Sequence, residues 1–325
     1  MKETSFGPRR DGNERRVTVL CPVFNEERCI APFYERLRAA LASCGDRYEF
    51  ELLFSNNCST DGTLGEILKL REKDRSVQVV TLSRNFGYEK NLVAGLEHVQ
   101  SDAVVIIDVD CEDPPEMIPA FLAGWEEGHD VVYGIRASRP EPRPIQWARK
   151  AFYRLTRAIA DYDFVLDMAE FSLFTERVRR QVLANRSTYP FIRAELGSVG
   201  FSMKGIRYAR QRRIAGTTHY NLWRMFEFAV GGMLSSSTFP LRFVSWLGFP
   251  LALLTVLATI GLAVGSSELR MLDLLLLANL TFLIVSFSFV SIYVARIYKD
   301  GVGKPIFIVD EDASHLNRER QRPAA

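Results

Sequence analysis

The sequence is poor in residues that bind soft metals or form cross-links. It has 4 histidines and 5 cysteines in 325 residues, and the cysteines show neither paired spacing nor histidine partners at zinc-site distances. These absences argue against a zinc site and a disulfide framework. Unpaired thiols are typical of a reducing compartment. We therefore expect free thiols at Cys21, Cys29, Cys44, Cys58 and Cys111.

The sequence also lacks a strong charge of one sign and an apolar run at its start. A formal net charge of +2 gives no electrostatic case for binding nucleic acid. Residues 1–16 are polar, which argues against a secretory signal and predicts a flexible tail. Basic residues cluster instead at 136–157 and 204–213, where they would meet phosphate or anionic lipid.

Two long apolar runs lie near the C-terminal end. Residues 243–265 have no charge and residues 271–294 have only Asp273, and each run is long enough to cross a hydrocarbon core of about 30 Å. The linker between them, SSELR, is too short to be a domain. The runs therefore predict a transmembrane helical hairpin, with a pair of buried core helices as the alternative.

Positive charge predicts the orientation of this hairpin. Arg242 precedes the first run, and Arg296, Lys299 and Lys304 follow the second. Positive flanks favour the cytoplasmic side. We expect a multi-pass protein of the inner (plasma) membrane whose large N-terminal part and both termini are cytoplasmic.

The segment just before the hairpin, residues 221–242, mixes aromatic residues and methionine with few charges. This composition predicts an amphipathic helix that lies along the membrane interface. A helix packed on the preceding domain is the alternative.

The N-terminal part alternates between short β-branched runs and helical stretches. This alternation predicts an α/β fold with a mostly parallel sheet and right-handed crossovers. Ligands of such sheets bind beyond the carboxyl ends of the strands. The expected strands are 17–21, 50–55, 77–82 and 103–108, and the expected helices are 26–44, 61–73 and 88–100.

The end of the fourth expected strand is crowded with acidic residues, namely Asp108, Asp110, Glu112 and Asp113. In an extended segment, positions 108, 110 and 112 point to one side. Carboxylates this dense repel one another unless they share a cation. Their hard oxygen ligands suit Mg²⁺ or Mn²⁺. The pattern favours a metal site over its alternative, a solvated acidic turn.

Four segments in this order carry a family resemblance: CPVFNEE (21–27), NNCSTDGT (56–63), SRNFG (83–87) and DVDCEDPPE (108–116). Together they resemble the family 2 glycosyltransferases, and within them the polyprenyl-phosphate branch of dolichol-phosphate mannose synthases and bactoprenol glucosyltransferases. The likeness runs from Val17 to Arg296. It implies a GT-A Rossmann-like domain, a nucleotide-sugar donor, a polyprenyl (undecaprenyl) phosphate acceptor at the bilayer and a homo-oligomer.

The resemblance also implies roles for individual residues. The nucleotide-sugar would be bound by Pro22, Phe24, Asn25, Glu26, Asn56, Asn57, Arg84, Lys90 and Asp108. The metal would be held by Asp108, Asp110 and Glu112. The acceptor phosphate would be held by Arg136, Arg210, Arg213 and Tyr220. The catalytic set would be Asp108, Asp110, Glu170, Arg136, Arg210 and Arg213.

The sequence departs from the family pattern at two places. Asn56 and Asn57 replace a common Asp-Asp, and the usual Gly-Asp-Phe-Arg segment has Glu170 at the Asp position and Ser172 at the Arg position. Both changes point to a distinct sugar or acceptor. We expect a UDP-sugar rather than a GDP-sugar donor.

A lipid phosphate is already anionic, so it needs no strong general base. The expected reaction is therefore an inverting hexosyl transfer that depends on alignment and charge neutralisation. Two alternatives are a processive polysaccharide synthase, which would show a Gln-x-x-Arg-Trp motif and more spans, and a non-catalytic lipid- or nucleotide-binding scaffold. The expected order is a tail (1–16), a catalytic domain (17–220), an interfacial region (221–242), two spans (within 243–296) and a cytoplasmic C-terminal tail (297–325).

Overall fold

The computed structural model describes residues 15–136, 168–185, 187–214, 238–264 and 269–317. In these residues one eight-stranded sheet has the order β7-β5-β6-β4-β1-β2-β3-β8. Its strands are β1 (Arg15–Val23), β2 (Tyr48–Asn56), β3 (Val77–Leu82), β4 (Ala103–Ile106), β5 (Val131–Arg136), β6 (Met168–Thr175), β7 (Met203–Tyr208) and β8 (Val309–His315).

The centre of the sheet is the predicted parallel α/β unit. Strand β1 pairs in parallel with both β2 and β4, and β2 pairs in parallel with β3. Strand β6 is antiparallel to both β4 and β5, while β7 is parallel to β5. The sheet is therefore mixed, as in a GT-A domain, with its parallel core confirmed and an antiparallel strand inserted beside it.

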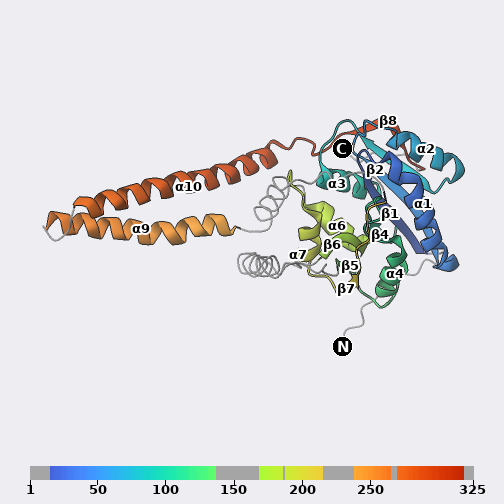
Figure 1. The fold of residues 1–325 in the computed structure, drawn as a ribbon, viewed down its shortest axis with the longest axis horizontal. Coiled ribbons are helices and arrows are strands. Elements are labelled where there is room, and N and C mark those ends of the chain that lie inside the picture. The colour runs from blue at the N-terminus through green and yellow to red at the C-terminus, as the bar shows by residue number, and fades with distance from the viewer. Residues whose placement is uncertain (1–14, 137–167, 186, 215–237, 265–268, 318–325) are drawn as a thin grey trace.

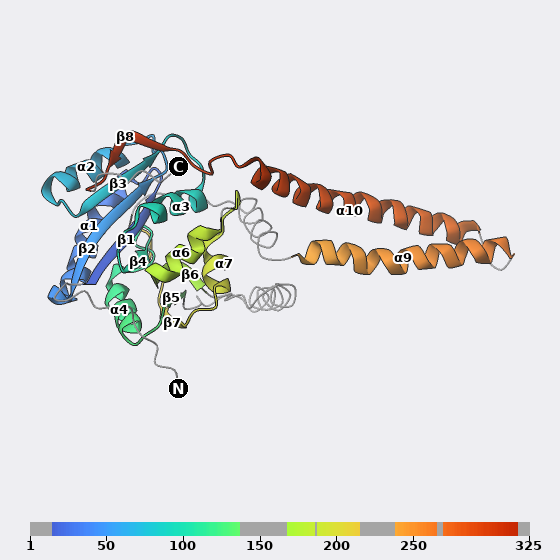
Figure 2. The ribbon, with the colours of Figure 1, turned by 180° about the vertical axis from the view of Figure 1, so that it is seen from behind.

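Helices cover both faces of the sheet (Figures 1 and 2). On one face, Val19 and Phe54 pack with Phe33 of α1; on the other, Leu20 and Leu53 pack with Leu92 of α3. Adjacent strand residues thus face opposite layers, and buried parallel strands have near-continuous apolar runs for this reason. The first layer has α1 (Glu27–Ala42), α2 (Thr63–Lys73) and α4 (Ile118–Glu126), with the 3₁₀ turns η1 (Gly45–Arg47) and η2 (Pro115–Met117); the second has α3 (Tyr88–His98), α6 (Glu176–Ala184) and α7 (Ile192–Ser198).

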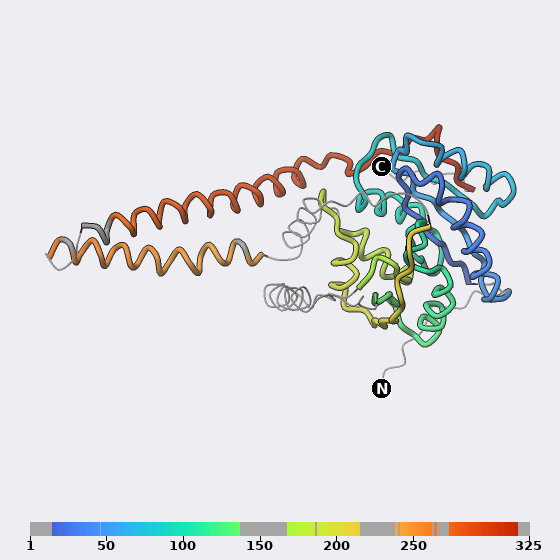
Figure 3. Tube along the Cα trace, in the orientation of Figure 1, coloured from blue at the N-terminus to red at the C-terminus, as the bar shows by residue number. Residues whose placement is uncertain are grey.

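Two long helices, α9 (Phe239–Ala263) and α10 (Leu269–Val302), form a hairpin that projects from the sheet domain (Figure 3). Their membrane-length stretches, Leu241–Gly261 and Asp273–Val302, have mean hydropathies of 2.0 and 2.2. In the most apolar part of each stretch, only 6% is buried inside the protein. Core helices would bury such surfaces, so the alternative of two buried helices is wrong. The exposed apolar sides suit a hydrocarbon environment.

The C-terminal segment corrects one expectation. Residues 297–325 were expected to be a tail, but α10 continues to Val302 and β8 pairs antiparallel with β3. The backbone N–H of Ser83 also donates to the carbonyl of Ile308 at 2.9 Å. The strand covers the edge of β3, whose backbone polar groups would otherwise lack partners. Residues 1–14, residues 215–220 of the expected catalytic domain and residues 221–237 of the expected interfacial segment (221–242) lie outside the described residues.

Candidate active site

The carboxyl ends of several strands bring charged side chains to one edge of the sheet. Glu26 follows β1, the acidic turn 108–113 follows β4, and Arg136 ends β5. The segment after β7, residues 209–214, crosses this edge. The backbone N–H of Gln211 donates to the backbone carbonyl of Glu112 at 2.8 Å, and that of Ile214 donates to the backbone carbonyl of Asp110 at 3.1 Å. Residues distant in sequence thus meet where the parallel strands predict a ligand site.

The acidic turn holds its carboxylates under mutual repulsion. Tyr88 donates its hydroxyl to Asp108 Oδ1 at 3.0 Å, and Asp110 Oδ1 accepts the backbone N–H of Glu112 at 2.9 Å. Burial, together with the carboxylates of Asp110 and Asp113, raises the pKa of Asp108 to about 7. Burial likewise raises the pKa of Asp110. A cation bound here would relieve this repulsion.

Arginines face these carboxylates from the segment after β7. Arg213 forms ion pairs with Glu26 and with Asp110, the latter at 3.4 Å. Arg210 pairs with Glu112. Two of the arginines expected on the acceptor phosphate therefore neutralise the expected donor and metal residues in this structure. Their guanidinium groups are already at the site, where they form ion pairs with carboxylates.

A third arginine has a more buried partner. Arg136 donates to Asp113 at 2.8 Å, and the hydroxyl of Tyr208 donates to the same carboxylate at 2.6 Å. The Asp113 side chain is only 2% exposed. A buried carboxylate needs such a charged partner. Asp113 was noted in the sequence as part of the acidic cluster, and the structure shows it orienting Arg136.

The three expected metal ligands do not converge. Asp108 and Asp110 lie on the same turn, but Glu112 is turned to Arg210. Within the described ranges, no three acidic, histidine or thiol groups are arranged to hold an ion. The oxygen chemistry of Asp108 and Asp110 fits Mg²⁺ or Mn²⁺. Glu112 is paired with Arg210 in this structure, and its role as a ligand stays a prediction.

The expected nucleotide-side loops are tied together by neutral hydrogen bonds. Asn57 accepts the backbone N–H of Phe86 at 2.9 Å and donates to Asn85 at 3.0 Å. Asn56 accepts from the backbone N–H of Ser59 at 3.0 Å, and Asn25 accepts from Thr60 at 2.8 Å. Asn56 and Asn57 thus hold the loops rather than present free amides. Asn85, Ser59 and Thr60 were not among the expected site residues.

The remaining expected residues are spread around these loops. Phe24 is 40% exposed, so its ring is accessible for stacking. Arg84 is exposed and lies 3.9 Å above the ring of Phe86. Lys90 is half-buried on α3, and Pro22 is buried in β1. Tyr220 lies outside the described residues.

The sequence is similar to those of known proteins over most of its length. The model of the family "Glycosyl transferase family 2" matches residues 18–187, more than half of the chain. The chain is 31% identical over 317 residues to the uncharacterized glycosyltransferase YkcC of Bacillus subtilis (strain 168), covering 94% of this chain and 96% of that protein. It is 31% identical over 307 residues to the bactoprenol glucosyl transferase of Shigella phage SfV, covering 91% and 99%.

The chain belongs to glycosyl transferase family 2. It is therefore a glycosyltransferase, as the four motifs predicted. Among solved structures, the mannosyltransferase PcManGT of Pyrobaculum calidifontis aligns with a TM-score of 0.46 at 18% identity, over 66% of this chain and 61% of that one.

In this family 2 glycosyltransferase, Glu170 lies on β6, and its charge acts on Asp108 of the acidic turn. Its carboxylate is 3.7 Å from Arg193 Nε on α7. Burial raises the pKa of Glu170, while Arg193 lowers it. Arg193, Tyr88 and Glu89 were not predicted. Tyr88 and Glu89 directly follow the SRNFG motif, and that position after a strand end was the available signal.

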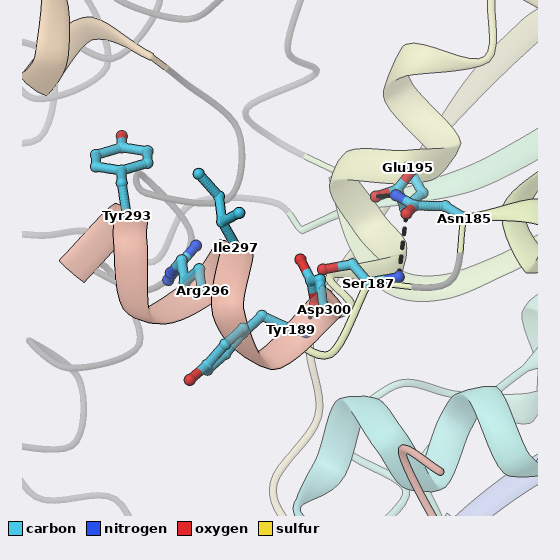
Figure 4. Close-up of a pocket in the computed structure, with 8 residues that line it drawn as sticks. All are labelled: Asn185, Ser187, Tyr189, Glu195, Tyr293, Arg296, Ile297 and Asp300. Carbon is cyan, nitrogen blue, oxygen red and sulfur yellow. Dashed lines mark hydrogen bonds between the residues drawn. The ribbon is translucent and has the colours of Figure 1, made fainter. Parts of the chain in front are cut away.

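The catalytic domain is joined to the hairpin by polar contacts at the end of α10. Figure 4 shows Tyr189 and Asp300, two of the residues at this junction. Asp300 accepts from the backbone N–H of Thr188 at 2.8 Å and from its hydroxyl at 2.6 Å. Lys299 donates to the Tyr189 hydroxyl at 2.6 Å, and Arg296 lies 4.7 Å from the Tyr189 ring. A cavity of about 220 Å³ lies between these elements. Segment 187–189 thus fixes the transferase domain against the hairpin.

Proposed function

We propose that this glycosyltransferase is an inverting hexosyltransferase that moves a sugar from a nucleotide-sugar, with a UDP-sugar favoured, to polyprenyl (undecaprenyl) phosphate. One observation carries the proposal: three arginines meet an acidic strand end in a domain bonded to two membrane-length helices. The similarity to proteins named bactoprenol glucosyl transferase, which covers 91% of this chain and 99% of the phage SfV protein, supports the lipid acceptor.

The acidic turn would serve the donor. Asp110, with Asp108 beside it, would hold Mg²⁺ or Mn²⁺, which offsets the negative charge of the leaving nucleoside diphosphate when bound. Glu26 and Phe24 would contact the nucleotide. The raised pKa of Asp108 supports a bound cation, because a cation removes the cost of keeping these carboxylates ionised together.

The arginines would serve the acceptor. A guanidinium binds a phosphate through two parallel N–H groups, which also fixes its orientation. Arg210 and Arg213 would exchange Glu112 and Asp110 for the lipid phosphate as the cation and donor bind. Arg136, oriented by Asp113, would complete the grip. The phosphate attacks the anomeric carbon opposite the leaving group, so the configuration inverts, and Glu170 would orient the sugar or acceptor.

The hairpin would bring this site to the cytoplasmic surface of the inner membrane. Pairing of β8 with β3 supports a common side for both flanks, since the chain after α10 returns to the domain that precedes α9. Arg242, Arg296, Lys299 and Lys304 flank the helices, and positive flanks favour the cytoplasm. The two termini would then both be cytoplasmic, and association into a homo-oligomer is part of the proposal.

The test is a transfer assay on the full chain in detergent. Labelled UDP- and GDP-sugars are offered with Mn²⁺ or Mg²⁺ and with undecaprenyl phosphate, and label is counted in the organic phase. Undecaprenol, which lacks the phosphate, is the matched control acceptor. We expect label only with the phosphorylated lipid and a cation. Transfer from no donor sinks the proposal, and equal transfer to undecaprenol contradicts the role of the arginines.

A further inference from the structure

Glu89 is a carboxyl group beside the site that the proposed function does not use. It lies in the first turn of α3, next to Tyr88, whose hydroxyl is bonded to Asp108. The residue is partly exposed, but its Oε1 atom is buried and has no hydrogen-bond partner among the residues that the structure describes. A buried carboxyl oxygen without a partner calls for an explanation.

The other oxygen of Glu89 binds α7. Oε2 accepts the backbone N–H of Ile192, the first residue of α7, at 3.0 Å. The next residue, Arg193, is the one that faces Glu170 at 3.7 Å. Neighbouring residues of α3 therefore hold Asp108 and α7, and α7 in turn holds Glu170.

The charges around Glu89 determine the form it takes. Burial and the carboxylate of Glu170 raise the pKa of Glu89 to about 8, against the opposing effects of the Ile192 backbone N–H and the Arg193 guanidinium. Tyr88 lies beside it on α3, and Arg136 and Asp113 act on Glu170 from the far side. This shift favours the protonated form of Glu89 at neutral pH, and Oε1, which accepts no hydrogen bond from the described residues, is the oxygen available to carry the proton. A neutral Glu89 does not compete with Glu170 for the ion pair with Arg193.

Segment 187–189, which precedes α7, binds the end of α10 through Thr188 and Tyr189. The contacts therefore run without a break from the membrane hairpin through α7 to Glu170. Glu89 is the point at which α7 is bonded to the helix that contacts Asp108.

We propose that Glu89 is a positioning residue for the transfer reaction: as a neutral carboxyl group it anchors the start of α7, and so keeps Arg193 on Glu170 and Glu170 in register with Asp108. The proposal rests on the proposed function in one respect, since Glu170 is taken to orient the sugar or the acceptor. Glu89 touches neither substrate. Ionisation of Glu89 would put a second negative charge beside Glu170 and compete for Arg193.

The experiment compares E89Q, E89A and wild type as full chains in the undecaprenyl phosphate assay, with kcat and donor KM measured from pH 6 to pH 9.5. Gln keeps an acceptor for Ile192 and cannot ionise. We expect wild-type kcat to fall above about pH 8, and we expect E89Q to retain kcat within about twofold at pH 7 and to lack that fall. We expect E89A to lower kcat at least about tenfold with donor KM changed less than about twofold. Glu97→Ala, at an exposed position on the same helix, is the control and should match wild type.

An E89Q profile that falls above pH 8 as wild type does, or an E89A enzyme with wild-type kcat, overturns the proposal. If E89A does not fold, the pH profile of E89Q decides alone. If wild type transfers no sugar to the lipid phosphate, the proposed function is wrong instead. The same variants are then compared by hydrolysis of the nucleotide-sugar, where the same pattern supports Glu89 as a positioning residue and its absence overturns that role.

Discussion

The two sides of the site are held in different ways. On the expected nucleotide side, Asn57, Asn56 and Asn25 hold neighbouring loops through neutral hydrogen bonds between side chain and backbone. On the expected phosphate side, Arg210 and Arg213 bind carboxylates of the acidic turn. The first set has no charge that a substrate must displace, whereas charged ligands compete directly for the second. We therefore predict a preorganised donor side and an acceptor side whose partners change during the reaction.

The largest expected effect comes from removing the acidic centre. Asp110→Ala should lower kcat/KM for transfer about 1,000-fold, roughly 4 kcal/mol of transition-state stabilisation, because the cation that neutralises the leaving diphosphate would lose its main ligand. The measurement is label transferred to undecaprenyl phosphate with saturating Mn²⁺. Asp312→Ala, at an exposed position on β8, is the control. Wild-type turnover by Asp110→Ala in EDTA would refute the metal role.

Arg213 tests whether charged partners exchange. Arg213→Ala should lower transfer about 100-fold through loss of acceptor alignment. The Mn²⁺ concentration for half-maximal donor binding should fall severalfold, because a cation competing at Asp110 is gone. These changes run in opposite directions, which a simple loss of folding cannot produce. Arg212→Ala, at the exposed neighbouring position, should leave both values unchanged. A rise in the Mn²⁺ requirement would contradict the exchange.

The buried carboxyl groups of Asp108 and Glu89 should also set the pH dependence of stability. Asp108 has its pKa raised to about 7 and Glu89 to about 8. The folded chain therefore binds more protons than the unfolded chain between about pH 4 and pH 8, and the free energy of unfolding decreases as pH rises through that window. We expect the Tm of the cation-free protein to fall from pH 5 to pH 8.

The same experiment separates the two sides of the site. Mn²⁺ should raise the Tm more at pH 8 than at pH 5. Asp108→Asn should reduce both the fall in Tm with pH and the pH dependence of the Mn²⁺ effect. Asp312→Asn is the control at an exposed position. A Tm that rises with pH in the cation-free protein would show that these carboxylates do not repel one another in the folded chain.

Much of the preorganised side was predictable from the sequence. Runs such as VTVLC and AVVIID are buried on both faces, so they identify parallel strands, and polar residues after them identify the ligand edge. The apolar length of α9 and α10 likewise predicted the hairpin. Local composition contains this information because each segment's pattern directly reflects what it packs against.

The rest depends on partners that local sequence does not name. VDEDASH of β8 has no apolar alternation, and it is a strand because the edge of β3 needs a partner. Glu112 was expected to bind metal, and its pairing with Arg210, which is 98 residues away, could not be predicted from the local sequence. Asn57 was expected to bind the nucleotide-sugar, and its hydrogen bonds to Asn85 and Phe86 in the loop after β3 were likewise not predictable. Each of these assignments requires the tertiary arrangement.

The smallest expected effect belongs to the preorganised side. Asn57→Ala removes one acceptor and one donor that hold Asn85 and Phe86, at a cost of about 1–3 kcal/mol in stability. Because these contacts exist before substrate binds, donor KM should rise about tenfold while kcat changes less than about twofold. Asn317→Ala also loses side-chain hydrogen bonds, but to Arg71 and Arg75 rather than to the donor loops, so it should leave donor KM unchanged. A fall in kcat at constant KM would mean that Asn57 acts in the transition state, and the distinction between a preorganised side and an exchanging side would then fail.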